Sequence, residues 1–285
     1  MSPPPQVRSE AQPLARTPAG RGAPSGQGAP SGQVTTAVLP ATKLTWRWTR
    51  FEVGLWLREP AAVLLNMAYP LIMLAFFMVA LPELRTDGQV ALGLAADLSL
   101  VGTMMVCLNF PATAIPEARR SDFYRYARTL PAGPGPRLVA WAAAPFLCGL
   151  ASALVAAVVG ALVTAAEPGP ADLLAVMGGA VALAVPATSI GMALGFMLTP
   201  KSALAVALTA AFAMILFGGI SGLPLPGWID RVSGFAPPGA AADLMTAWRE
   251  GGIEWRGIGV LIAWTVAGLA ATLALYRRDE GAHHD

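Results

Sequence analysis

Long apolar runs dominate the sequence from Pro60 onward and constrain its fold more than any other feature. A helix that crosses a membrane needs about 20 apolar residues, and six runs approach or exceed that length: 60–81, 97–116, 138–166, 171–199, 202–223 and 257–276. These runs are too long and too continuous for barrel strands, which alternate over about ten residues. Only 13% of the residues are charged, about half the share usual in soluble domains. The sequence therefore predicts an all-α membrane protein with six transmembrane helices.

The chain divides into a membrane domain and two tails. Residues 1–40 are rich in Pro, Gly and Ser, and "GAPSGQ" occurs twice in tandem at 22–33. Such a tract cannot bury enough apolar surface to offset its ordering entropy, so we expect a disordered tail. Residues 41–278 form the predicted six-helix domain, and residues 279–285 form a short cytoplasmic tail.

Lysine and arginine are unevenly distributed around the six runs. When both termini are placed in the cytoplasm, the outer loops carry few of these residues, namely Arg85, Arg231, Arg249 and Arg256. The remainder, apart from those in the first 40 residues, fall on the inside, as the positive-inside rule requires. The composition, with many Ala, Gly, Pro and Arg and only two lysines, is typical of a GC-rich bacterial genome. The expected location is therefore the bacterial cytoplasmic membrane.

An amphipathic segment, "KLTWRWTRFEVGLWLREP", precedes the first run. Leu44, Trp48, Phe51 and Leu55 recur at helical spacing, with basic residues beside them. Tryptophan and arginine together are typical of a helix that lies along a membrane surface. The residues expected at this surface are Trp46, Arg47, Trp48, Arg50 and Phe51. A simple cationic flank of the first transmembrane helix is the alternative.

Three polar residues lie within or beside the predicted spans. Asn66 and Asn109 are well inside the first two runs, and Asp97 begins the second. Polar groups inside a bilayer often mark a substrate path, but the asparagines can equally form hydrogen bonds between helices. For Asp97 the favoured interpretation is a position at the outer mouth of its span.

Little in the chain predicts catalysis, a metal site or a cofactor. The only histidines are His283 and His284, so an intramembrane serine protease would lack its base. The segment "GFMLTPKS" departs from the phosphate-binding loop pattern because Pro200 replaces its second glycine, and proline offers no amide hydrogen. We therefore expect no ATP site on this chain. The net charge of +2 is too small to suggest binding to nucleic acid.

The segment "EARRSDFYRYARTLPAGPGPRL", residues 117–138, lies between the second and third runs. Phe123, Tyr126, Ala127 and Leu130 recur at helical spacing, and Pro131 ends the pattern. This short cytoplasmic helix has three interpretations. It lies on anionic headgroups, it supplies positive charge for orientation, or it docks into a groove on a soluble partner.

The arrangement resembles the permease subunit of type-2 ATP-binding-cassette transporters over residues 41–278. The resemblance rests on the cationic helix before the first span, the six spans, the Glu-Arg-rich segment 117–138, and "LPGWIDRVSGFAPPGAAADLMTAWREGG" after the fifth span. It implies a coupling helix that contacts a separate ATPase subunit through Glu117, Arg119, Arg120, Phe123, Tyr126, Leu130 and Pro131. The chain departs from the usual glycine after the Glu-Arg cluster, where it carries Ser121 and Asp122.

The resemblance further implies a dimer of permease subunits, identical or different, that exports its substrate. Apolar spans without internal charge favour a hydrophobic or amphipathic substrate, such as a drug or a lipid. Two alternatives remain: a secondary transporter, and a membrane scaffold that transports nothing. A secondary transporter would usually show ionisable residues near the midplane and an internal repeat.

Overall fold

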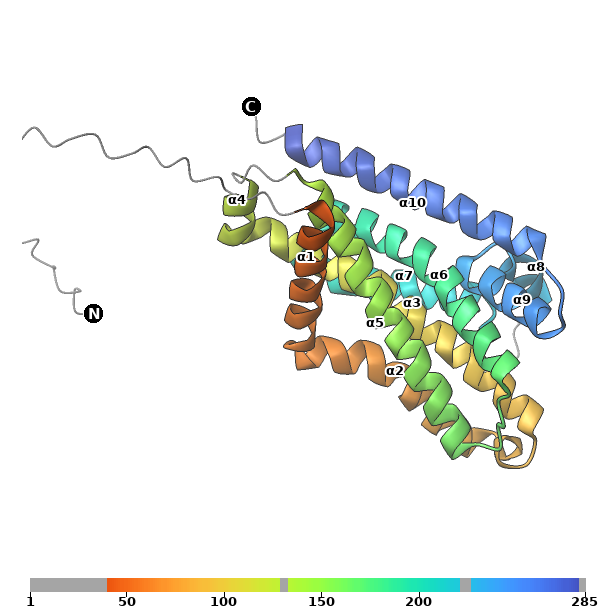
Figure 1. Ribbon diagram of the computed structural model, residues 1–285. Helices are drawn as coiled ribbons and strands as arrows, with labels where there is room; N and C mark the ends of the chain where they lie inside the picture. Colours follow the sequence, from red (N-terminus) through yellow and green to blue (C-terminus); the bar gives the residue numbers. More distant parts are fainter. Residues whose placement is uncertain (1–39, 129–132, 221–226, 282–285) are drawn as a thin grey trace, which may run out of the picture. The chain divides into compact units, whose positions relative to one another are not determined.

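The computed structural model describes residues 40–128, 133–220 and 227–281, and these residues form helices without any strand. The helices, shown in Figure 1, are α1 (Ala41–Leu57), α2 (Pro60–Ala80), the 3-10 helix η1 (Pro82–Arg85), α3 (Gly88–Arg120), α4 (Asp122–Arg128), α5 (Gly135–Val163), α6 (Pro170–Met197), α7 (Pro200–Phe217), α8 (Gly227–Ser233), α9 (Pro237–Arg249) and α10 (Trp255–Gly281). The expected disordered tail lies outside the described residues except for residue 40, and so do Leu130, Pro131 and the last residues of the C-terminal tail.

Five of these helices, α3, α5, α6, α7 and α10, are long and apolar enough to cross a membrane. The first predicted span corresponds to α2, in which the apolar portion Asn66–Ala80 is shorter. An all-helical protein with several apolar helices of this length is a multi-pass membrane protein. The short helices α8 and α9 occupy the long loop between the fifth and sixth predicted spans.

Helix starts follow local sequence signals. Pro60, Pro170 and Pro200 each stand in the first turn of a helix, where the missing amide hydrogen is not needed. Asp87 caps α3, because its Oδ1 accepts hydrogen bonds from the backbone amides of Gln89 at 2.9 Å and Val90 at 3.2 Å. The predicted second span began at 97, nine residues after the observed start of α3. Asp97 therefore lies inside this helix and not at its first turn.

The central helix is α3, which packs against α2, α5, α6, α7 and α9 (Figure 1). Its apolar stretch is largely buried, whereas the apolar stretches of α7 and α10 are mostly exposed. Two glycines of α6, four residues apart, let α6 approach α3 closely. A Cβ atom at Gly191 would lie 2.4 Å from the carbonyl oxygen of Leu108, and one at Gly195 would lie 2.5 Å from that of Pro111. Small residues four apart typically allow close helix packing in membrane proteins.

Helix α1 packs along α5, and its buried residues are Thr49, Glu52 and Trp56. The predicted apolar stripe only partly faces the protein, since Phe51 and Leu55 are exposed. The exposed face of α1 is thus aromatic and basic, while one carboxylate is turned inward. This inward face supplies part of the site described below.

One end of the helix bundle is held together by Arg119 at the end of α3. Its guanidinium donates to the carbonyl oxygen of Phe196 at 3.0 Å and forms an ion pair with Asp279 near the end of α10. These contacts join the ends of α3, α6 and α10. Figure 1 shows α4 at the same end, and α8 and α9 at the other end of α10.

Candidate functional site

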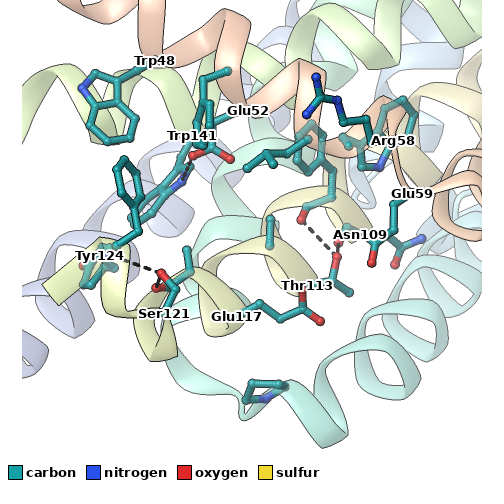
Figure 2. A pocket seen from close by; sticks show the side chains of 18 of the residues that line it. Trp48, Glu52, Arg58, Glu59, Asn109, Thr113, Glu117, Ser121, Tyr124 and Trp141 are labelled. Atoms are coloured by element: carbon teal, nitrogen blue, oxygen red, sulfur yellow. Dashed lines mark hydrogen bonds between the residues drawn. The ribbon is translucent and has the colours of Figure 1, made fainter. Parts of the chain in front are cut away.

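A cavity of about 780 Å³ lies between α1, α2, α3, α4, α5 and α7. Figure 2 shows the side chains on its wall, which come from both sides of the turn between α1 and α2 and from the last turns of α3. Its volume is within the range of small-molecule sites, about 300–1,000 Å³. The wall is mostly apolar and aromatic, with a few charged and amide side chains. This composition is typical of a site that binds an organic ligand.

A group of three aromatic side chains lies on the cavity wall and joins α1 to α4; Phe51 and Phe123 are exposed and Trp48 is half-buried. The ring centroids of Trp48 and Phe51 lie 6.0 Å apart, and each lies 5.8 Å from the ring centroid of Phe123. Aromatic pairs at this separation stabilise beyond the area they bury. This aromatic trio therefore places α4 against α1.

A buried polar cluster lies deeper between α1 and α5. Trp141 Nε1 donates to Glu52 Oε1 at 3.0 Å, and the guanidinium of Arg137 lies 4.3 Å from the ring centroid of Tyr124 and 5.4 Å from that of Trp141. Burial raises the pKa of Glu52, although the hydrogen bond from Trp141 and the charge of Arg137 oppose that rise. The positive charge of Arg137 is thus balanced by the faces of the Tyr124 and Trp141 rings and by the nearby carboxylate of Glu52.

The two asparagines singled out in the sequence meet at the cavity wall. Asn109 Nδ2 donates to Asn66 Oδ1 at 2.9 Å, and both residues are buried. Asn109 Oδ1 accepts no hydrogen bond from any residue that the structure describes. The asparagines therefore form the hydrogen bond between helices that was one of the two alternatives, and this bond joins α2 to α3. Both residues also line the cavity.

Asp97 does not belong to this site. It lies on α3 twelve residues before Asn109, about 18 Å along the helix axis, and it does not line the cavity. The structure thus brings together two of the three residues suggested for a substrate path and leaves the third elsewhere.

The residues of α4 divide between two faces. Tyr124 and Ala127 are buried, whereas Phe123 is 52% and Tyr126 62% exposed. The predicted stripe thus splits, because Ala127 turns inward with Tyr124. Among the other residues of the predicted docking segment, Arg120 is exposed and Glu117 lines the cavity.

Sequence reasoning did not find Glu52, Arg137 and Trp141 as site residues. The spacing of Arg137 and Trp141 could have indicated that these two side chains are neighbours, because they lie four residues apart and so share one face of α5. No comparable local signal pairs Glu52 with a residue 89 positions later.

No protein-family model matches the chain, and neither does a curated protein or a solved structure.

Proposed function

We propose that the chain is the transmembrane permease subunit of an ATP-driven exporter and works with a separate cytosolic ATPase of the ATP-binding-cassette type. The proposal is carried by one observation: α4, a short helix between the long apolar helices α3 and α5, exposes Phe123 and Tyr126. Exposed aromatic side chains beside arginine are typical anchors for a protein partner. The resemblance of the sequence to type-2 permeases assigns that partner as the ATPase.

The position of α4 supports a cytoplasmic contact. It lies at the end of the bundle where Arg119 joins α3, α6 and α10. Arg120 is exposed beside it, and the basic helix α1 is adjacent. Under the positive-inside rule this is the cytoplasmic end, with both termini inside. The exposed Trp46 and the basic residues of α1 would then contact the inner leaflet of a bacterial cytoplasmic membrane.

A second permease subunit and membrane lipids would cover the exposed apolar surface of α7 and α10. ATP binding would bring two ATPase subunits together, and each would move the α4 that it holds. This displacement would reach the cavity, because Phe123 and Tyr124 are both on its wall. The substrate of such an exporter would be hydrophobic or amphipathic, such as a drug or a lipid, in keeping with the aromatic cavity wall.

Purification of the tagged protein from its native membranes tests the proposal. We expect a stoichiometric soluble subunit with an intact phosphate-binding loop to co-purify, and Tyr126→Asp to remove it. Tyr126 does not line the cavity, so its replacement removes no side chain from the cavity wall. Val232→Asp is the matched control, since it places a charge at an exposed apolar position on α8, away from α4.

Both variants should reach the membrane in equal amounts, and only Tyr126→Asp should abolish ATP-dependent transport. Absence of an ATPase from a preparation that keeps its oligomeric state would contradict the proposal. It would favour a secondary transporter or a scaffold.

A further inference from the structure

Two carboxylates face the cavity without a cation beside them. Glu59 follows α1, and Glu117 lies near the end of α3, yet they are close enough for their charges to repel each other. Within residues 40–128, 133–220 and 227–281, neither carboxylate makes a hydrogen bond or an ion pair through its side chain. A positive charge between them would relieve this repulsion.

The arginines on the same wall do not neutralise this pair. Arg137 lies over Tyr124 and Trp141, with the charge of Glu52 nearby. Figure 2 shows the side chain of Arg58 across the cavity from Glu117. The part of the wall formed by Glu59 and Glu117 is therefore negative.

A buried acceptor points to a ligand independently of the carboxylates. Asn109 is 1% exposed and lines the cavity, and its Oδ1 receives no hydrogen bond from the described residues. A buried acceptor left in this way costs about 1–3 kcal/mol. Phe110, the next residue along α3, also lines the cavity, and its ring is stacked on that of Trp56 with centroids 5.3 Å apart. Aromatic faces and oxygen acceptors together are the surroundings that an organic cation prefers.

We propose that this cavity binds a lipophilic organic monocation, with its charge near Glu59, Glu117 and Asn109 Oδ1 and its apolar groups against Trp56, Phe110 and the aromatic trio. The site has room for a ligand of drug size. A bare inorganic cation would leave most of its aromatic wall without a contact. That this ligand is the transported substrate rests on the proposed function; that it binds does not.

Equilibrium dialysis with two ions of the same shape and opposite charge tests the proposal. Purified full-length protein in detergent is dialysed in separate cells against tetraphenylphosphonium and tetraphenylborate, with empty micelles as blanks. We expect saturable binding of tetraphenylphosphonium and at least about tenfold weaker binding of tetraphenylborate. This comparison needs no variant, so it does not depend on how a mutant folds.

Two variants then locate the site. Combined Glu59→Gln and Glu117→Gln should weaken binding of tetraphenylphosphonium about fivefold, as expected for the loss of two solvent-accessible ion pairs. Glu167→Gln is the matched control, because it removes an exposed carboxylate from the loop between α5 and α6, outside the cavity wall. It should bind as the parent does.

Equal binding of both ions, no saturable binding, or an unchanged dissociation constant in the double variant would each overturn the proposal. The assay contains neither ATP nor an ATPase. If the chain binds the cation but purifies without an ATPase, the cation site is supported and the proposed function is contradicted. If an ATPase co-purifies but the cation does not bind, the proposed function is supported and the cation site is contradicted.

Discussion

Replacement of Gly191 by alanine tests the close approach of α6 to α3. The new Cβ would lie 2.4 Å from the carbonyl oxygen of Leu108 and 2.7 Å from Cγ of Pro111. The carbonyl belongs to the backbone of the central helix, so it cannot move by a side-chain rotation. To restore an ordinary contact the two helices must separate locally by about 1 Å, a gap that forfeits a quarter to a half of each neighbouring van der Waals contact.

Overpacking of this kind costs about 1–3 kcal/mol. For a chain of this size the cost corresponds to a lower unfolding midpoint by about 2–5 °C. Thermal unfolding in detergent, followed by fluorescence-detected size exclusion at one heating rate, measures the change. The control is Gly93→Ala on α3, where a Cβ atom meets nothing within 4 Å and the helix should gain slightly from alanine. Equal midpoints for the two variants would refute the reasoning.

Two further predictions concern the buried charges. Since the pKa of Glu52 is raised above its ordinary value of 4.5, its stabilising contribution is present in full below about pH 4.5 and is lost as the pH rises through the folded-state value. The difference between the unfolding midpoints of the parent and of Glu52→Gln should therefore shift in favour of the parent as the pH falls from 7 to 4.5. A difference that does not change with pH would contradict this. Asp279→Asn should cost about 1–3 kcal/mol by breaking its ion pair with Arg119. Arg119→Gln should cost more, because it also removes the hydrogen bond to the carbonyl oxygen of Phe196. The double variant should lose less than the sum of the two single losses, and fully additive losses would show that the pair does not act as a unit.

The helices could be predicted from the sequence because each long apolar run satisfies its backbone hydrogen bonds within itself. The main error was the start of the second predicted span, which was placed at residue 97 because Asp97 was taken as its boundary. The better signal was Asp87, a capping residue directly before Gly88 and Gln89. An apolar helix tolerates a single carboxylate after its start, whereas a cap must satisfy the free amides of the first turn.

The site could be predicted only in part. Asn66 and Asn109 stand out because they are polar residues in apolar runs, but their pairing depends on how α2 and α3 pack. Glu52 sits between Phe51 and Val53, and periodicity alone does not show which face of α1 turns inward. That choice is made by Trp141 of α5, through a contact that no local pattern encodes.

Helix α4 connects the two proposals physically. Only seven residues long, it has Tyr124 stacked on Trp141 at a centroid distance of 5.9 Å and Phe123 packed on α1 in the aromatic trio. Tyr126, on the same helix, is exposed. A helix this short moves as one piece, so a partner that displaces Tyr126 also displaces two side chains of the cavity wall. By linkage, a ligand that favours one position of α4 must also change the affinity of that partner.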